Sequence, residues 1–185
     1  MAEVIRPRIK PIDVELKEPL KSKMAKIFPE HLPSPNLYRS VARNESLFID
    51  MIDMRFIGPT GLMDRKSIPP RLRELLILRT CVLTHNDYEF NLHVRTISEQ
   101  MGLTKAEIED LNNERIDDSL WPEDEASLIS LTDELVQTTS ISDAVFERVA
   151  KHYSDAELIE MVQLVGLYTT VAMMVSLIRP ELDPY

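Results

Sequence analysis

Hydrophobic and polar positions follow a helical period over residues 69–102, and this stretch organises our interpretation of the chain. The pair Pro69 and Pro70 marks a helix start, because proline fits the first turn of a helix. Apolar residues then recur about every 3.6 positions. The polar run at 84–87 can end this helix and cap a second one, which we expect to continue as far as Gly102.

The same period predicts helices over most of the remaining chain. Pro19 places the clean start of the first helix a few residues inside its segment, and residues 43–45 mark a bend in the second. Thr104 and Glu107 form the capping-box pattern of a further helix. The predicted helices cover residues 16–28, 36–57, 105–112 and 123–137, a short segment after Ser142, and residues 155–178.

The last predicted helix is apolar nearly all round after Glu160, so we expect it to be buried on most sides, as a core helix or at a subunit interface. Residues 1–15 instead predict an extended arm, which either wraps a neighbouring subunit or is a partly disordered terminus. No strand pattern, repeat or domain boundary is visible. We therefore predict an all-α, compact helical bundle with one domain over residues 1–185, in which residues 1–32 form the arm and a short helix and residues 33–185 form the core.

The net charge, the hydrophobic runs and the cysteine count argue against several classes of function. The formal net charge of −10 argues against nucleic acid or an anionic membrane as a partner, since both prefer a basic surface. No N-terminal segment has the pattern of a signal peptide, and no run reaches the roughly 20 apolar residues of a membrane span. Cys81 is the only cysteine, which excludes an intramolecular disulfide. We expect a cytoplasmic protein.

The candidate chemistry lies in the two central helices. Glu89 and His93 are four residues apart and therefore share one helix face, and a helical hairpin can bring Glu74 alongside them. A carboxylate beside an imidazole is a pairing that suits proton transfer. The alternative is a buried ion-paired network that only ties two helices together.

We expect no metal and no cofactor. His85 and His93 are eight residues apart, and this spacing does not place them on one helix face.

The motifs in this region resemble those of the carboxymuconolactone decarboxylase family, which also includes the alkylhydroperoxidase D type of peroxidase. The resemblance rests on a leucine-rich helix with an early glutamate, a polar turn, a tyrosine–glutamate pair with a histidine four residues after the glutamate, and a Gly-Leu-Thr helix end. In this chain these features read RELLILR, LTHNDYEFNLH and MGLTKAEIEDL, and the final helix LVGLYTTVAMMVSLI is also similar. The similarity runs from about Pro33 to the C-terminus.

This resemblance implies the compact helical fold of the family and a homo-oligomer, usually a trimer or hexamer, with the active site near a subunit interface. The peroxidase branch uses a Cys-x-x-Cys dithiol seven and four residues before the site histidine. Those positions hold Asn86 and Glu89 here, so a dithiol peroxidase is disfavoured. Leu167 stands where related sequences often have a histidine.

A glutamate and a histidine at positions 89 and 93 are usual in the decarboxylase branch, whereas Glu74 matches the proton relay of the peroxidases. The resemblance therefore favours a cofactor-free lyase that acts on a small cyclic carboxylate of the 4-carboxymuconolactone type. In this hypothesis Glu74, Glu89 and His93 are catalytic, and Asn86, Tyr88 and His85 bind the substrate.

Two other functions stay open. One is a non-catalytic oligomeric binding or scaffold protein of the same fold, and the other, disfavoured by the single cysteine, is a peroxidase-like antioxidant protein. If His93 is closed off from solvent, the scaffold protein is favoured. If His93 lies in a pocket that opens to solvent, the lyase is favoured.

Overall fold

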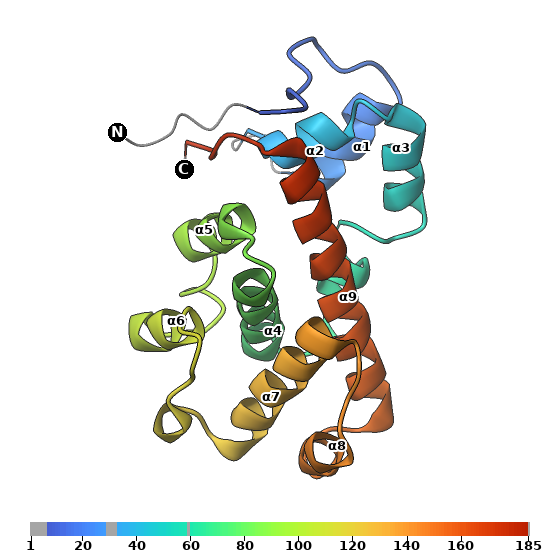
Figure 1. The fold of residues 1–185 in the computed structure, drawn as a ribbon. Helices are drawn as coiled ribbons and strands as arrows, with labels where there is room; N and C mark the ends of the chain where they lie inside the picture. Colours follow the sequence, from blue (N-terminus) through green and yellow to red (C-terminus); the bar gives the residue numbers. More distant parts are fainter. Residues whose placement is uncertain (1–6, 29–32, 59, 185) are drawn as a thin grey trace, which may run out of the picture. The chain divides into compact units, whose positions relative to one another are not determined.

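The computed structural model describes residues 7–28, 33–58 and 60–184. Within these residues the chain forms nine α-helices and two short 3₁₀-helices and no strand, which confirms the all-α prediction (Figure 1). In chain order the helices are α1 (Leu20–Ile27), α2 (Asn36–Val41), α3 (Glu45–Asp53), η1 (Leu62–Asp64), α4 (Pro70–Leu83), α5 (Asp87–Thr96), α6 (Lys105–Leu111), η2 (Asp118–Leu120), α7 (Glu123–Thr138), α8 (Asp143–Val149) and α9 (Asp155–Ile178).

Several helix boundaries follow the local signals of the sequence. Helix α1 begins directly after Pro19, and α4 begins at Pro70. Thr104 and Glu107 form the expected capping box at the start of α6. The Ser142 hydroxyl accepts a hydrogen bond from the backbone N–H of Val145 at 3.3 Å and so caps α8. These boundaries depend on neighbouring residues, which is why a sequence pattern can predict them.

The long helix predicted over residues 36–57 is wrong, because the structure divides this segment into α2 and α3. Asn44 lies between the two helices, where its side-chain oxygen accepts a hydrogen bond from the backbone N–H of Leu47 at 3.3 Å. An asparagine in this role starts a new helix in a new direction. The predicted bend is therefore a full break.

The described chain divides into two compact units. The first comprises residues up to Arg65 together with Met173–Pro184, and the second comprises Lys66–Ala172, so the long helix α9 contributes to both. We describe each unit by itself. The expectation of one domain over residues 1–185 stays a prediction.

The first unit holds the described part of the N-terminal arm against its own chain. The backbone N–H of Arg8 donates to the carbonyl of Ile178 at 2.9 Å, and the Ser40 hydroxyl donates to the carbonyl of Ile9 at 3.1 Å. The Arg43 side chain donates to the carbonyl of Lys10 at 2.6 Å. Residues 8–10 are therefore fixed by α2, the turn after it and the end of α9, while residues 1–6 lie outside the described part of the arm.

The second unit is built around α4, which packs against α5, α6 and α7, while α7 also packs against α8 (Figure 1). Arg71 joins three of these helices. Its guanidinium donates to Glu107 of α6 at 2.6 and 3.1 Å and to Glu125 of α7 at 2.7 and 2.8 Å. This network lowers the pKa of Glu107 to about 2, chiefly through the hydrogen bonds from Arg71.

Arg79 forms a second connection from α4, and it is almost completely buried, with 1% of its surface exposed. Its guanidinium donates to both carboxylate oxygens of Asp133 in α7, at 2.6 and 3.1 Å. It also donates to the carbonyls of Leu111 and Asn113, at 3.0 and 2.8 Å. The buried charge is thus paired and hydrogen-bonded on several sides, which is the condition for a stable buried arginine.

Helix α9 is less buried than its composition led us to expect. Its inner face includes Met161, Leu164 and Tyr168, at most 3% exposed, whereas Ile159 on the other face is 66% exposed. By length and composition alone this 24-residue helix could cross a membrane, because it contains an 18-residue window with a mean hydropathy of 1.8. The expectation that no run is long and apolar enough for a membrane span is therefore wrong. A core helix of a soluble protein passes the same test, and one such helix is weak support for a membrane span.

Candidate functional site

The turn between α4 and α5 sets the geometry of the candidate site. His85 adopts a positive φ of 53°, which reverses the chain after α4. The backbone N–H of Asn86 donates to the carbonyl of Cys81 at 2.8 Å, and the Asn86 side-chain oxygen accepts from the backbone N–H of Glu89 at 3.3 Å. Asn86 is therefore the N-cap of α5, and the polar turn predicted from the sequence directs α5 back along α4.

This hairpin brings Glu74 of α4 to His93 of α5. The two carboxylate oxygens of Glu74 lie 3.0 and 3.1 Å from Nδ1 of His93. Glu74 is completely buried and His93 is 7% exposed. The predicted pairing of these two side chains is therefore present in the structure, at hydrogen-bonding distance and away from water.

Ser98 completes the surroundings of Glu74. Its hydroxyl donates to Oε1 of Glu74 at 2.6 Å, and Ser98 itself has no exposed surface. Two hydrogen bonds to one carboxylate stabilise its charged form, because a carboxylate accepts but does not donate.

Ser98 reaches Glu74 because α5 ends at Thr96, six residues before the predicted end at Gly102. The carbonyl of His93 accepts the backbone N–H groups of both Ile97 and Ser98, at 2.8 and 3.0 Å, so the chain turns out of the helix at this point. Gly102 closes the turn with a φ of +101°, a conformation that strongly favours glycine. The prediction that α5 continues to Gly102 is therefore wrong, because Gly102 ends the turn that follows the helix and not the helix itself.

The other ring nitrogen of His93 faces two further groups. The Tyr168 hydroxyl of α9 lies 3.4 Å from Nε2, and Oε2 of Glu89 lies 3.8 Å from the same atom. The rings of His93 and Tyr168 meet edge to face, with centroids 5.7 Å apart. Glu89 therefore shares the helix face of His93 as predicted, but it lies beyond normal hydrogen-bonding distance.

The electrostatics of the cluster favour an ionised Glu74 next to a protonated His93. Burial opposes the charge on the imidazole, but the carboxylate of Glu74 and then that of Glu89 outweigh it, so the pKa of His93 is raised above 6.5. Burial likewise opposes the charge on Glu74, yet His93 and the Ser98 hydrogen bond outweigh it and lower the pKa of Glu74 below 4.5. An ionised Glu74 fixes a proton on Nδ1, so Nε2 is the nitrogen that can gain or lose a proton.

The three predicted substrate-binding residues have different positions. Asn86 is 2% exposed and Tyr88 is 5% exposed, so both are core positions, and Nδ2 of Asn86 is buried with no hydrogen-bond partner. His85 is exposed and lines a cavity of about 580 Å³ together with Asp87, Phe90 and Asn113. The lining of this cavity does not include Glu74, Glu89 or His93. His85 therefore lines a cavity separate from the buried pair, while the substrate-binding role of His85, Asn86 and Tyr88 stays a prediction.

Cys81 lies on the wall of the same cavity but is only 1% exposed. Burial, followed by the nearby carboxylates of Glu89 and Glu74, raises the pKa of its thiol well above 9.0. A reactive cysteine needs the opposite shift, because the thiolate is the nucleophile. Within the described part of the chain, no group of three or more histidine, cysteine and acidic side chains is arranged to hold a metal ion.

Sequence reasoning missed two members of the cluster, Ser98 and Tyr168. No local signal could have found Ser98, because it contacts Glu74 only through the irregular turn after α5. Tyr168 did carry a signal, since it is a tyrosine inside an apolar helix, and a buried tyrosine hydroxyl usually finds a polar partner. Leu167, which stands where related sequences often have a histidine, is buried as well, with 2% of its surface exposed.

Comparisons with known proteins bear on the family and on the fold of this chain. A family model described as "Carboxymuconolactone decarboxylase family" matches residues 56–133. These residues include Glu74, Glu89, His93 and Ser98 and exclude Tyr168. No curated protein matches the chain in sequence.

Several solved structures share the fold at low sequence identity. The apo form of the debrominase Bmp8 has a TM-score of 0.76 at 12% identity, covering 96% of this chain and 92% of that one. A protein of unknown function from Agrobacterium tumefaciens, whose description suggests an AhpD antioxidant defence role, has a TM-score of 0.68 at 18% identity, covering 78% of this chain and 97% of that one. An uncharacterised peroxidase-related protein from Silicibacter sp. TM1040 has a TM-score of 0.68 at 16% identity, covering 96% and 93%. These similarities support the fold alone, and they confirm the expected helical architecture.

Proposed function

Because the chain belongs to the carboxymuconolactone decarboxylase family through residues 56–133, as its motifs indicated, we propose that it is a cofactor-free lyase that acts on a small cyclic carboxylate. One observation carries the proposal. The Glu74 carboxylate holds Nδ1 of His93 at 3.0 and 3.1 Å, and this leaves Nε2 as the nitrogen that transfers a proton.

Each residue of the cluster has a role in this proposal. His93 is the general acid, Glu74 fixes its tautomer and stabilises the imidazolium, and Ser98 holds Glu74 in place through its 2.6 Å hydrogen bond. Glu89 and Tyr168 lie at 3.8 and 3.4 Å from Nε2, where they can return the proton to His93 after it has been used. His85, Asn86 and Tyr88 remain candidates for substrate contacts.

With a substrate of the 4-carboxymuconolactone type, the bond between the ring carbon and the carboxylate carbon breaks and CO₂ leaves. The electron pair stays on the lactone as a dienolate, and a ring carbon then takes a proton from Nε2 of His93. The overall change is the exchange of CO₂ for a proton, and neither an oxidant nor a reductant is needed. A positioned acid of this kind accelerates such a step by about 10²- to 10⁴-fold.

The burial of the cluster favours a second candidate, a non-catalytic binding or scaffold protein of the same fold. His93 is 7% exposed, and neither the cavity next to His85 nor the apolar pocket between α7 and α9 is lined by Glu74, Glu89 or His93. In this case the cluster only ties α4, α5 and α9 together. A peroxidase-like antioxidant function is disfavoured by the single, buried Cys81.

The expected trimer or hexamer, the cytoplasmic location and the absence of nucleic-acid and membrane partners belong to the same proposal. The family resemblance supports the oligomer, the net charge of −10 supports the absence of nucleic-acid and anionic-membrane partners, and the single cysteine fits a reducing compartment.

The test is the loss of 4-carboxymuconolactone catalysed by the purified full-length protein. We expect turnover that falls by at least about 10²-fold in His93→Gln and in Glu74→Gln. The matched control is His152→Gln, which removes an exposed histidine in the turn after α8 and should keep full activity. A folded wild-type protein without turnover would remove this reaction and leave the scaffold function as the better account.

A further inference from the structure

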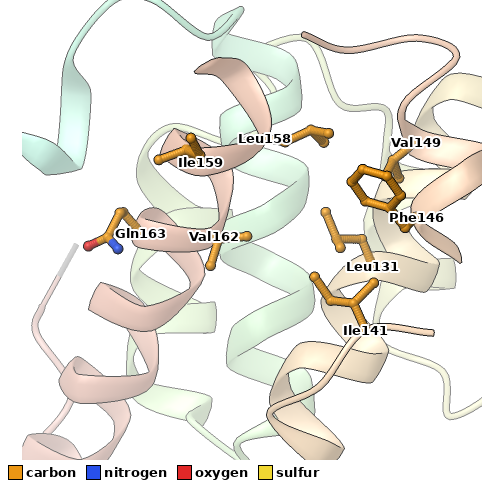
Figure 2. A pocket seen from close by; sticks show the side chains of 8 residues that line it. All are labelled: Leu131, Ile141, Phe146, Val149, Leu158, Ile159, Val162 and Gln163. Atoms are coloured by element: carbon orange, nitrogen blue, oxygen red, sulfur yellow. The ribbon is translucent and has the colours of Figure 1, made fainter. Parts of the chain in front are cut away.

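A second feature of the Lys66–Ala172 unit is an apolar pocket of about 320 Å³ between α7, α8 and α9, which we call the α7–α9 pocket (Figure 2). Side chains of α9 form one side, and side chains of α7, α8 and the connecting segment form the other. The pocket is lined by Leu131, Ile141, Phe146, Val149, Leu158, Ile159, Val162 and Gln163. It shares no residue with the Glu74–His93 cluster.

The pocket has a buried floor and an exposed rim. Leu131 and Val149 are each 1% exposed, and Leu158 is 8% exposed. Phe146 and Ile159 at the rim are 50% and 66% exposed. Large apolar side chains at the mouth of a concave apolar site lose unfavourable contact with water when a ligand fills it.

The charge of the lining identifies the ligand class. The whole chain carries a net charge of −10, yet no charged side chain lines this pocket. Gln163 is the one polar residue of the lining, and its amide points away from the other lining side chains in Figure 2. An ionic ligand would lose its hydration here without a compensating charge or hydrogen bond, so the pocket complements an uncharged molecule.

The size of the pocket also limits the ligand. An apolar cavity of about 150 Å³ is large enough for benzene, and ligand sites in proteins start at about 300 Å³. With about 320 Å³ the α7–α9 pocket has room for one substituted ring or two small rings. Walls from three helices make it concave, which suits a small molecule better than a flat protein surface.

We propose that the α7–α9 pocket binds a small, uncharged, apolar molecule of one or two rings, independently of the reaction at His93. Binding is driven by the burial of apolar surface from Phe146, Ile159 and Val162. No bond is made or broken in this pocket.

The test compares toluene with benzoate, which has a carboxylate in place of the methyl group. The full-length protein is titrated with each compound, and backbone amide NMR signals are followed. We expect saturable shifts with toluene at Phe146, Val149 and Val162, and no saturable shifts with benzoate. Equal binding of benzoate, or no toluene shifts at the lining, would overturn the proposal.

Two variants provide the matched comparison. Val162→Phe places a phenyl ring in the pocket and should weaken toluene binding at least tenfold, whereas Thr170→Phe places the same ring on an exposed position of α9 outside the lining and should leave binding within twofold. Ile141→Phe is a second filling variant that avoids the helix interior if Val162→Phe does not fold. If both filling variants bind toluene as the wild type does, the pocket is not the site. Lining signals that change on dilution of the free protein would show that a second copy covers the pocket, which also overturns the proposal.

Discussion

Helix α4 carries two buried charged groups five residues apart, and they differ in kind. Arg79 is bound to both oxygens of Asp133 and to the carbonyls of Leu111 and Asn113. Glu74 is bound to His93 and Ser98. We call the first group the arginine cluster and the second the histidine cluster. A guanidinium stays protonated in proteins, whereas an imidazole is a group that can gain or lose a proton.

This difference separates a structural cluster from one that is suited to chemistry. The guanidinium of Arg79 is surrounded by acceptors of its own chain, so it is fully used in joining α4 to α7 and to the segment after α6. His93 has one nitrogen held by Glu74 and a second that faces a hydroxyl and a carboxylate at longer distances, 3.4 and 3.8 Å. Two clusters that start from buried side chains of one helix thus differ in whether a proton can move.

The largest expected effect is the loss of the arginine cluster. Arg79→Met should lower the free energy of unfolding by about 3–5 kcal/mol, because it leaves Asp133 partly buried without its charge partner. Urea denaturation measures this change. The control is Arg148→Met, which removes a more exposed ion pair with Glu123 and should cost much less. Equal costs for the two variants would contradict the structural role of Arg79.

Glu74→Gln should have the next largest effect, about 1–3 kcal/mol, because it leaves His93 buried without its carboxylate partner. The pKa of His93 should fall, since Glu74 contributes more than Glu89 to raising it and burial continues to lower it. Histidine ring NMR measures this pKa, and the ring signals of His152 serve as an internal control. An unchanged pKa of His93 would mean that Glu74 does not control its protonation.

The two clusters should also differ in their pH dependence. The raised pKa of His93 contributes stability that is complete below pH 6.5 and is lost as the pH rises through the folded-state value. The lowered pKa of Glu74 contributes stability that is present above pH 4.5 and is lost as the pH falls through its folded-state value. The pair should therefore stabilise the fold most between about pH 4.5 and 6.5.

Measured from pH 3 to 9, the stability difference between wild type and His93→Gln should be greatest in this window and decrease on both sides, by at most about 1.4 kcal/mol per pH unit and proton. The difference between wild type and Arg79→Met should show no such maximum in this window, because it involves no histidine. A flat profile for His93→Gln would show that the histidine cluster is as permanent as the arginine cluster.

Ser98→Ala should give the smallest effect, about 1.5 kcal/mol, since it removes one hydrogen bond to a charged carboxylate. The Ser98 hydroxyl helps to lower the pKa of Glu74, so its loss should move the acid limb of the stability profile to higher pH. Ser127→Ala is the matched control, because that buried hydroxyl donates to the carbonyl of Asp124 and touches neither cluster. An equal shift of the acid limb in both variants would exclude a specific role for Ser98.

The sequence alone predicted those features that depend on neighbouring residues. Pro70 and the capping residues Thr104 and Ser142 start helices where expected, and the four-residue spacing places Glu89 and His93 on one face of α5. The hairpin of α4 and α5, and with it the meeting of Glu74 and His93, followed from the polar turn at residues 84–87. Local hydrogen bonds and helical periodicity are sufficient for these predictions.

Only the tertiary structure decided the features that depend on distant residues. Asn44 divides the predicted long helix into two, α5 ends early so that Ser98 reaches Glu74, and Tyr168 arrives at Nε2 of His93 from 75 positions along the chain. The burial of the cluster and the exposed rim of the α7–α9 pocket are likewise results of packing. A sequence pattern shows which face of a helix is apolar, but the neighbouring helices decide which side chains that face meets.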